Sequence, residues 1–447
     1  MNYGDEYRRK LVSADEAVKV IKSGDWIDYG PLCGQVIALD QALVKRKDEL
    51  EDIKIWSQCS FYLPEIFRVD PRGETFIWNT WHLSAQDRRV AAGGRPVYYA
   101  PMRYSELPRF VREHIKTIDV AMMQVAPMDN HGFFNFGPQT SHCKALCDTA
   151  KKLILEVNEN QPRCLGGYEE SIHISQVDYI VEGKNPPLPQ LAESPPTEVD
   201  RKAAGHILEE MRDGCCLQLG IGGMPNAVGK MIAESELKDL GCHSEMLVDA
   251  FVDMYEAGRL SGSKKQIDPE KLVYTFAVGS QRLYDFINDN PLCASYPVNY
   301  TNNIAIASRN DNLISINNAI EVDLYGQVCS ESTGTRIISG TGGQLDFVLA
   351  AYESRGGKSF ICLPSTKSEG NGEIKSTIVP TLTPGAIVTD PRTVAHFIVS
   401  EYGKCELKGK TVWQRAEGLI NIAHPDFRDQ LIKDAEVQGI WRRTNRL

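Results

Sequence analysis

Residues 213–256 read DGCCLQLGIGGMPNAVGKMIAESELKDLGCHSEMLVDAFVDMYE, and this stretch decides the fold. Its first apolar run, residues 215–219, is too short for a helix and predicts a buried strand. A glycine-dense turn follows at residues 220–225, and the pattern of residues 226–232 is helical. A strand that leads through such a turn into a helix N-terminus predicts an anion-binding site, because glycines let backbone N–H groups approach a ligand and the first helical turn leaves donors unpaired.

A second strand-like run, residues 243–248, contains Glu245. Charged residues are depleted in strands and are rarely buried without a partner. The turn that could cradle a ligand lies just before this run, so Glu245 is a candidate for a carboxylate placed beside that ligand. The alternative is a solvated strand end, and spacing alone does not separate the two.

The composition describes an ordinary globular protein. With 447 residues the chain is long enough for about two or three domains. Hydrophobic residues make up 42% and charged residues 24%, which is typical of soluble proteins. The net charge of −10, with no basic run to offset it, argues against a nucleic-acid partner.

No targeting or membrane segment is evident. The first residues, MNYGDEYRRKLVSADEAV, contain no apolar stretch of the kind that signal peptides carry. Nowhere does the chain reach the run of about eighteen apolar residues that spans a membrane. We therefore expect a cytoplasmic protein without a membrane partner.

The twelve cysteines do not form a disulfide framework, since they fall inside apolar runs where a reduced thiol acts as a small hydrophobic group. His142, Cys143 and Cys147 could share a helix face, but no C-x-x-C or second ligand pair accompanies them. The nine histidines form no ligand cluster. We expect no metal site.

The arrangement of the central stretch occurs twice. A helix beginning near Ser13, a strand at residues 25–29, a glycine turn at 30–34 and a helix at 36–44 match the helix at 198–211 and the elements after it. The interval from one helix-ending glycine to the turn glycine is equal in both copies. In a second match, strand–turn–strand patterns over residues 120–136 and 304–316 follow in the same order. The sequence thus predicts an α/β protein of two similar halves.

A proline-rich segment separates the halves. Residues 186–196 contain five prolines, which neither a helix nor a central strand tolerates, so we expect an extended linker at residues 184–197. The predicted domains are residues 1–183 and 198–447, and the second carries Glu245. The crevice between two such halves is the usual location of a ligand site, and we expect the active site there.

The glycine turns match neither of two common nucleotide-binding patterns in full. Gly220 and Gly222 begin a Rossmann fingerprint, but Pro225 stands at its third glycine, and Glu245 lies near the start of its run where a ribose-binding acid should close it. Lys358 fits the end of a P-loop, but Tyr352 stands at its first glycine. Neither pattern is satisfied.

Taken together, four motifs resemble a known family. They are residues 220–228 (GIGGMPNAV), 243–246 (HSEM), 339–347 (SGTGGQLDF) and 127–134 (PMDNHGFF). They are similar to motifs of the class I coenzyme A transferases in the acetyl-CoA hydrolase/transferase group, and the resemblance covers essentially the whole chain. It implies tandem CoA-transferase domains.

The resemblance also implies a covalent mechanism. A glutamate attacks an acyl-CoA thioester, a glutamyl-CoA thioester forms, and a carboxylate acceptor leaves as the new acyl-CoA with ping-pong kinetics. The implied substrates are a short-chain acyl-CoA and a carboxylate, with butyryl-CoA and acetate as the expected pair. No metal or other cofactor is implied, because CoA is itself a substrate.

Residue roles are carried over from the resemblance position by position. Glu245 would be the nucleophile. The residues implied to contact CoA are Gly220, Ile221, Gly222, Gly223, Met224, Ile320 and Gly343, and Lys367 could meet a CoA phosphate. Plainer interpretations stay open: a tight turn at 220–224, a helix-capping turn at Gly343, a core side chain at Ile320 and a solvated lysine at 367.

Other functions remain compatible with the same residues. The acyl substrate could be 4-hydroxybutyrate or propionate, since a methylene in a pocket discriminates by only about 1–3 kcal/mol. An acyl-CoA hydrolase would use Glu245 with water as acceptor. A non-catalytic acyl-CoA sensor would not need the carboxylate. We also expect a homo-oligomer, although no motif reports the oligomeric state.

Overall fold

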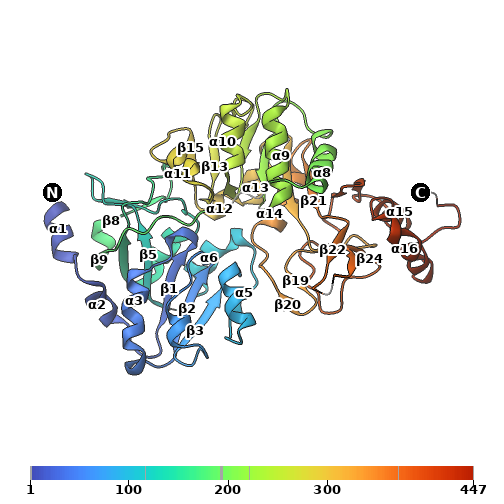
Figure 1. Cartoon of the computed structure of the whole chain (residues 1–447). Coiled ribbons are helices and arrows are strands. Elements are labelled where there is room, and N and C mark those ends of the chain that lie inside the picture. The colour runs from blue at the N-terminus through green and yellow to red at the C-terminus, as the bar shows by residue number, and fades with distance from the viewer. Residues whose placement is uncertain (1–2, 116, 192–194, 221, 371, 446–447) are drawn as a thin grey trace. The chain divides into compact units, whose positions relative to one another are not determined.

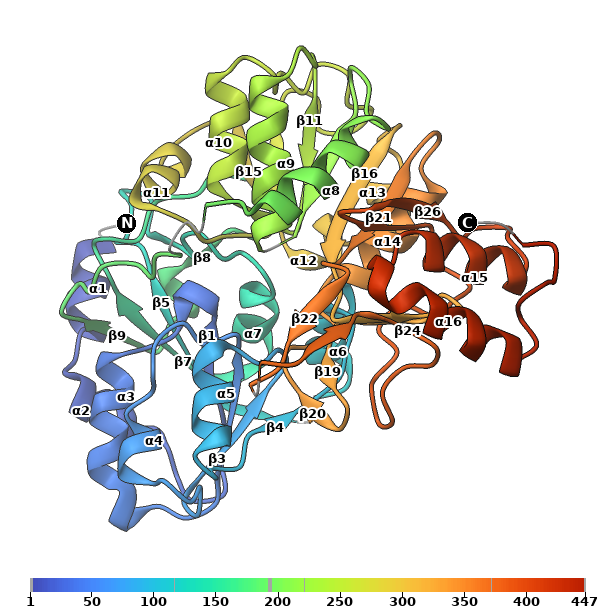
Figure 2. The same ribbon diagram turned by 45° about the vertical axis from the view of Figure 1, so that its right-hand side comes forward.

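The computed structural model describes residues 3–115, 117–191, 195–220, 222–370 and 372–445. The chain divides into two compact units. The first consists of Met1–Ala192 and Val273–Thr301, and the second of Glu193–Leu272 and Asn302–Leu447. Figure 1 labels their helices and strands, and Figure 2 shows the same elements from another side.

The first unit is built on a parallel sheet of seven strands. In spatial order these are β4 (Tyr98–Tyr99), β3 (Phe76–Thr80), β2 (Ile53–Gln58), β1 (Trp26–Pro31), β5 (Ile118–Val125), β7 (Ala150–Val157) and β9 (Tyr179–Glu182). Its α-helices are α1 (Tyr3–Lys10), α2 (Ala14–Ala17), α3 (Ala38–Leu43), α4 (Ile66–Val69), α5 (Ala85–Ala92), α6 (Leu107–Glu113), α7 (Cys143–Thr149), α11 (Gln281–Ile287) and α12 (Val298–Thr301). β6 (Phe133–Asn135) and β8 (Ser171–His173) form an antiparallel pair, and β13 (Leu272–Tyr274), β14 (Phe276–Ala277) and β15 (Cys293–Ser295) are short.

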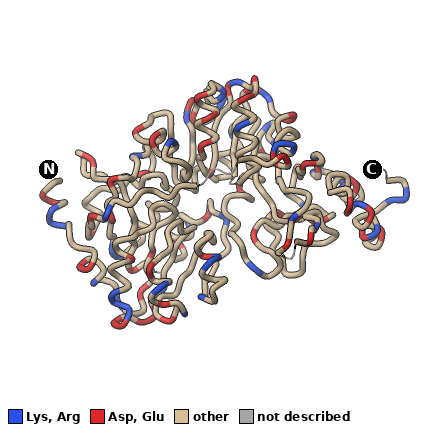
Figure 3. The backbone as a smooth tube through the Cα atoms, viewed as in Figure 1, with Lys and Arg blue, Asp and Glu red and all other residues tan. Residues whose placement is uncertain are grey.

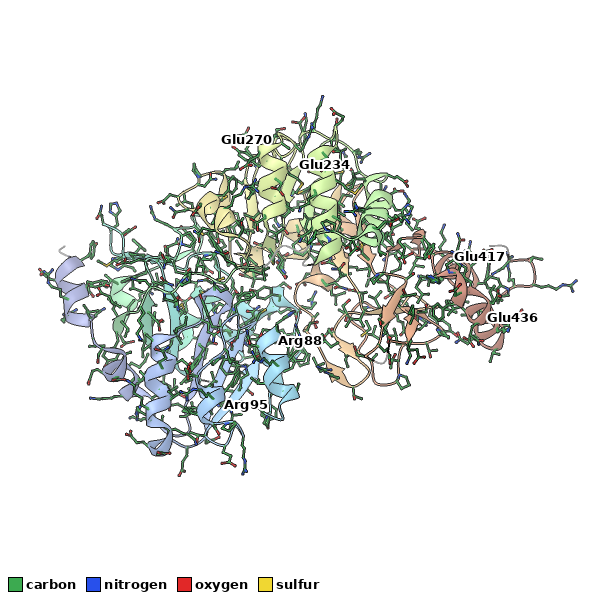
Figure 4. All side chains as sticks on the ribbon, in the orientation of Figure 1. Arg88, Arg95, Glu234, Glu270, Glu417 and Glu436 are labelled. Atoms are coloured by element: carbon green, nitrogen blue, oxygen red, sulfur yellow. The ribbon has the colours of Figure 1, made fainter. Side chains whose placement is uncertain are left out.

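A buried cation supports this sheet from the end of α5. Arg95, labelled in Figure 4, is 4% exposed and donates from Nη2 to the Phe76 carbonyl at 2.8 Å. Its guanidinium carbon lies 4.7 Å from the centre of the Phe67 ring, a cation–π contact. Arg88, also labelled in Figure 4, lies on α5 itself. The helix end is thereby fixed against β3.

The second unit contains a sheet of the same kind. The strands of this sheet that belong to the second unit run in the order β11 (Gly241–His243), β10 (Cys216–Leu219), β16 (Leu313–Asn318), β21 (Lys358–Cys362), β25 (Phe397–Ser400) and β26 (Gly403–Glu406), and among them only the last pair is antiparallel. The α-helices are α8 (Glu198–Leu208), α9 (Gly223–Glu234), α10 (Asp249–Glu256), α13 (Ile304–Ala307), α14 (Gln344–Glu353), α15 (Val412–Asn421) and α16 (Pro425–Val437). Helices α8, α9 and α10 lie side by side in Figures 1 and 2.

Short strands complete the second unit. They are β12 (Met246–Leu247), β17 (Glu321–Asp323), β18 (Val328–Cys329), β19 (Ser332–Thr333), β20 (Arg336–Ile337), β22 (Thr366–Ser368), β23 (Ile374–Ser376) and β24 (Ile378–Val379). β17 pairs with both β18 and β24, and β22 with β23. An apolar cluster joins this region to α15 and α16 through Val322, Ile378 and Leu419.

The predicted α/β architecture of two similar halves is confirmed. In each unit the strand before the glycine turn, β1 or β10, lies between the next strand of the chain, β2 or β11, and a later strand, β5 or β16. The strands β7 and β9 continue one sheet as β21 and β25 continue the other. The glycine turns therefore lie at equivalent places.

One supporting match was wrong. Residues 304–307, predicted as a strand, form helix α13. The Asn303 side chain accepts a hydrogen bond from the Ala305 N–H at 3.0 Å and caps the helix. A short apolar run does not reveal by its periodicity whether it is a buried strand or a helix. The Asx turn of the other copy is present, since Asp129 Oδ1 accepts from the N–H groups of His131 and Phe133.

The units differ from the predicted domains in one respect. Val273–Thr301 groups with the first unit rather than with the rest of residues 198–447. Backbone hydrogen bonds explain this grouping: Ala277 donates to Pro138 at 2.7 Å, and Ser141 donates to Thr275 at 3.1 Å. A pattern read along the chain does not show that a later segment returns to an earlier unit.

The described residues of the predicted linker, 184–191 and 195–197, lie in neither helix nor strand. Two tyrosine hydroxyls hold this segment to the first unit: Tyr62 donates to the Pro187 carbonyl at 2.9 Å and Tyr284 to the Pro189 carbonyl at 2.5 Å. The segment is thus anchored at its prolines. Thr197 then caps α8 in a reciprocal capping box with Asp200.

Charges of both signs are interspersed along both units in Figure 3. No helix in the described part of the chain is both long and apolar enough to cross a membrane.

Candidate active site

The functional residues predicted in the second half meet at one edge of its sheet. Strands β10, β11, β16 and β21 are parallel, so their carboxyl ends lie at the same edge, which is where ligands bind in open α/β sheets. The glycine turn follows β10, Glu245 follows β11, and Ile320 follows β16. All of them belong to the second unit.

Two glycines of the turn lie close to neighbouring asparagine side chains. A Cβ added at Gly220 would lie 3.2 Å from Asn317 Oδ1. Gly222 has a φ of +126° and caps α9, and a Cβ there would lie 2.6 Å from Asn318 Nδ2. The second glycine is therefore required both by conformation and by space. Helix α9 begins at Gly223, whereas Ile221 lies outside the described residues.

Polar side chains beneath this turn form a buried network. Gln218 Oε1 accepts from Ser315 Oγ at 2.7 Å and from Asn317 Nδ2 at 3.1 Å, while Gln218 Nε2 donates to Asn317 Oδ1 at 3.1 Å. Because its members satisfy one another, the network fixes β10 to β16 where the turn begins. The position of Gly220 is thereby rigid.

Glu245 does not lie within a strand as predicted. β11 ends at His243, and Glu245 occupies a bend before β12. Ser244 makes this bend, because its Oγ donates to the Met246 carbonyl at 2.8 Å and accepts from the Leu219 N–H at 3.3 Å. Glu245 thus follows the second strand, so the argument that it lies too early for a ribose-binding acid was wrong. The mismatch at Pro225 still separates the turn from a Rossmann fingerprint.

Two donors hold the Glu245 carboxylate. Asn302 Nδ2 donates to Glu245 Oε2 at 2.5 Å, and the Gly343 N–H is a second donor. Gly343 is the N-cap of α14, so the carboxylate faces the positive end of a helix. A Cβ built at Gly343 would overlap Glu245 Oε2 and Asn302 Nδ2. The backbone donor reaches the carboxylate only because this residue is a glycine.

Burial nevertheless weakens the acidity of Glu245. Desolvation is the largest effect and raises the pKa of Glu245 to about 7. The hydrogen bond from Asn302 lowers this pKa, the nearby carboxyl of Asp346 raises it, and the bond from Gly343 lowers it. The side chain is half-buried, so one face stays open to a reactant while the rest is enclosed by protein.

Sequence reasoning missed Asn302 and Asp346, the two polar side chains that act on Glu245. Asn302 is 1% exposed and Asp346 is fully buried. The adjacent pair Asn302 and Asn303 before an apolar run was a signal of a helix start. Asp346 lies within the motif at residues 339–347. Only its position in the first turn of the helix that follows Gly343 indicated that it would lie near Glu245.

Ile320 and Lys367 lie at the same edge in different environments. Ile320 is half-buried in the turn between β16 and β17, and its N–H donates to the Cys329 carbonyl at 2.8 Å. Lys367 lies in β22 with Nζ 3.7 Å from Glu321 Oε2. Met224, in the first turn of α9, is 4% exposed. The lysine thus has a carboxylate partner in the second unit.

The described residues contain no group of three or more His, Cys, Asp or Glu side chains that could hold a metal ion. His142 is buried before α7, with Nδ1 2.9 Å from Ser141 Oγ, and burial lowers its pKa to about 3. The Cys143 thiol donates to the Gln139 carbonyl at 3.1 Å. These contacts are those of a satisfied core.

Replacing the carboxamide tests the electrostatics of this site. We expect Asn302→Ala to raise the pKa of Glu245, because a donor to the charged form is lost, and to move the acidic limb of kcat/KM upward by about 1 pH unit. Lost orientation should lower kcat by about 10–100-fold. The pH dependence of kcat/KM measures both. An unchanged limb would show that Asn302 does not act on the carboxylate.

Comparison with known proteins fits this arrangement. The acetyl-CoA hydrolase/transferase N-terminal domain model matches residues 1–191, and the corresponding C-terminal domain model matches residues 279–435. The fold and site define an α/β enzyme with paired CoA-transferase domains. The chain belongs to the acetyl-CoA hydrolase/transferase family.

Two relatives and one solved structure are similar to the chain over nearly its full length. The butyryl-CoA:acetate CoA-transferase of Anaerostipes caccae is 58% identical over 447 residues, covering 100% of both chains. A probable butyrate:acetyl-CoA coenzyme A-transferase of Syntrophomonas wolfei is 54% identical and covers 99% of this chain and 98% of its own. The crystal structure of a 4-hydroxybutyrate CoA-transferase from Porphyromonas gingivalis superposes with a TM-score of 0.79 at 32% identity, covering 98% of this chain and 100% of that one.

Proposed function

We propose that this protein transfers CoA from butyryl-CoA to acetate, giving butyrate and acetyl-CoA. The observation that carries the proposal is the Glu245 carboxylate, held by Asn302 and the Gly343 N–H at the carboxyl edge of the sheet. Full-length identity of 54–58% to transferases named for butyryl-CoA or butyrate supports this substrate pair.

The proposed reaction begins with attack by Glu245. A carboxylate oxygen of Glu245 adds to the butyryl thioester carbonyl, the C–S bond breaks, and CoA leaves as thiolate, so a butyryl–glutamyl anhydride remains. The thiolate then attacks the glutamyl carbonyl, and butyrate leaves with the bridging oxygen of the anhydride. Glu245 becomes a glutamyl-CoA thioester. Acetate reverses the sequence and departs as acetyl-CoA. No proton is consumed overall.

The chain supplies the groups that these steps need. Each tetrahedral intermediate carries an oxyanion, which preorganised donors stabilise better than water does. When the glutamyl carbonyl is attacked, its oxygen becomes such an oxyanion, and Asn302 Nδ2 and the Gly343 N–H already face the Glu245 carboxylate. The same donors orient the nucleophile in the ground state.

The raised pKa of Glu245 suits this role. A more basic carboxylate is a stronger nucleophile, provided that it is ionised when acyl-CoA arrives. Since the pKa is raised to about 7, the fraction of reactive carboxylate grows as the pH rises and is lost below neutrality. The same burial, which causes the shift, would limit the access of water to the anhydride and thioester once acyl-CoA covers the open face.

The backbone of the glycine turn is proposed to receive the thioester end of CoA. Gly222, Gly223 and the first turn of α9 lie at the same edge as Glu245 and could present N–H groups there, with Met224 as an apolar wall. The Gly220 N–H donates to the Ile316 carbonyl at 2.9 Å, so Gly220 would contribute only close approach of its backbone. Ile320 is half-buried at this edge and could contact the pantetheine arm. Lys367 would meet a CoA phosphate by exchanging its Glu321 partner for the ligand.

Acyl transfer to water is the competing outcome, since the family name covers hydrolases as well. We expect release of butyrate beyond one equivalent per active site to require acetate, with free CoA forming at no more than about 1% of the transfer rate when acetate is absent, because exclusion of water would protect the thioester. Initial rates at varied concentrations of both substrates should give parallel double-reciprocal lines. Intersecting lines would exclude the covalent ping-pong route, and acetate-independent CoA release would favour a hydrolase.

The cellular setting is proposed with the activity. We infer a cytoplasmic homo-oligomer that uses no cofactor beyond its CoA substrates. Light scattering of the purified chain measures the first property, and full activity after dialysis against a chelator measures the last.

A further inference from the structure

Asp390 is a buried acid that the proposed mechanism does not use. It is fully buried in the second unit, and its Oδ1 has no hydrogen-bond partner among the described residues. Its backbone is fixed to β18, because Val328 donates to the Asp390 carbonyl at 3.1 Å and the Asp390 N–H donates back at 3.3 Å. Burying a carboxyl group with an unpaired oxygen costs free energy, so this position needs an explanation.

The other oxygen of Asp390 points to α14. Asp390 Oδ2 accepts from Gln344 Nε2 at 2.6 Å, and the same Nε2 donates to Ser330 Oγ at 2.8 Å. Gln344 is the first residue of α14 and directly follows Gly343. Two acceptors therefore fix the side chain next to the backbone donor of Glu245.

Ser330, the second acceptor of Gln344, also bonds to other segments at this edge of the sheet. Its Oγ donates at 3.0 Å to the carbonyl of Asn318, the last residue of β16, and its own carbonyl accepts from Ser339 Oγ at 3.0 Å. Its N–H donates to Thr389 Oγ1, next to Asp390, at 2.9 Å. One serine thus joins the end of β16, the start of the glycine segment 339–343 and the loop of Asp390.

We propose that Asp390 is a positioning residue for CoA transfer: by holding Gln344 it fixes the N-terminus of α14, and with it the Gly343 N–H, against Glu245. The inference rests on the proposed role of Glu245. An N–H displaced by about 1 Å loses most of its effect on a developing charge, which is how a residue that does not touch Glu245 can act on it.

The charged groups around both carboxyls define the pH test. Asp346 of α14 is the charged group that faces Glu245. The segment before α13 contributes the neutral side chain of Asn302. β11 ends in His243, and the side chain of His243 contacts Asn310. Asp390 is influenced mainly by its burial, then by Gln344 and Glu331, and its pKa is raised to about 7. Both carboxyls thus titrate in the same range, so variants must tell them apart.

The experiment measures how fast butyryl-CoA converts Glu245 to its glutamyl thioester, trapped with borohydride and followed by intact mass, together with the pH profile of kcat/KM. We expect Asp390→Ala to slow trapping about 10–100-fold. KM for butyryl-CoA should stay within about twofold, since Asp390 is fully buried. The acidic limb should move upward by about 0.5–1 unit, because Glu245 loses a donor to its charged form.

Asp390→Asn should keep trapping within about threefold of the unaltered protein, because the amide oxygen still accepts from Gln344. Asp390→Asn should also keep the acidic limb of the pH profile of kcat/KM. Loss of this limb would mean that the Asp390 carboxyl itself titrates, and it would overturn the inference. Gln344→Leu should reproduce Asp390→Ala, and the double variant should be no slower than either single one. Additive losses would show that the two residues act separately.

Asp40→Asn is the matched control. Asp40 is also a buried acid, with a pKa raised to about 7, but it lies in the first unit, where it accepts from the Tyr29 hydroxyl at 3.0 Å. We expect no change in trapping. If Asp390→Ala does not fold, Gln344→Leu and Asp390→Asn decide the question. Trapping of Asp390→Ala at the unaltered rate overturns the inference, whereas failure to trap the unaltered protein overturns the proposed function instead.

Discussion

Glu245→Ala is expected to lower the rate of CoA transfer by about 10⁴-fold or more, because a reaction that proceeds through a covalent intermediate loses its nucleophile. Borohydride added during turnover should reduce the glutamyl thioester of the unaltered protein to an alcohol, and the mass change should map to the peptide that contains Glu245. The variant should show no such change. Continued consumption of butyryl-CoA by unmodified protein would remove Glu245 from the mechanism.

Glu245→Gln and Glu245→Asp sharpen this test. The amide keeps the size of the side chain and its hydrogen bond from Asn302 through its oxygen, so the fold should be intact while transfer is lost. The shorter carboxylate keeps the charge but withdraws it from Asn302 and Gly343, and should retain a rate between the two extremes. Binding of CoA should persist in all three variants. A variant that lost binding as well would point to a structural role.

Gly343→Ala is expected to lower kcat by about 10²–10³-fold, although the change adds a single methyl group. The new Cβ would overlap both Glu245 Oε2 and Asn302 Nδ2, so the nucleophile and its donor must move apart. The φ of Gly343 is −100°, which alanine adopts without strain, so the cost falls on the site rather than on the backbone.

A glycine without such neighbours provides the comparison. A Cβ at Gly205, inside α8, would meet nothing within 4 Å, and Gly205→Ala should leave activity unchanged and stabilise the helix by about 0.5–1 kcal/mol. Thermal melts and kcat measured on both variants separate the two effects. If Gly343→Ala melts far below the unaltered protein, the loss of activity would reflect unfolding instead.

Much of the fold could be predicted because the patterns that report it are local. Short apolar runs, glycine turns and caps located β10, α9 and the matching elements of the first unit. The wrong predictions concern segments whose structure the local sequence pattern does not determine. The run at residues 304–307 is apolar in either state, and the capping Asn303 decides for a helix. The return of residues 273–301 to the first unit depends on hydrogen bonds to residues far back in the chain.

The candidate site was predictable to a similar extent. Motifs located Glu245, the glycine turn and Gly343, all of which lie at one edge of the sheet. The strand around Glu245 was wrong, because the hydroxyl of Ser244, rather than the apolar pattern, decides that the chain bends there. Asn302 and Asp390 act through distances that no spacing in the sequence records.

The return of Val273–Thr301 to the first unit has a consequence for how the protein is made. The first unit cannot be completed while the ribosome is still translating the first helices of the second, because strands β14 and β15 and helices α11 and α12 have not yet emerged. The contacts that residues 1–191 make with this segment therefore form only after the segment has been released from the ribosome. A cut at the proline-rich segment would leave the N-terminal fragment without Val273–Thr301 and the C-terminal fragment with this segment in addition to the second unit, so neither half corresponds to one unit.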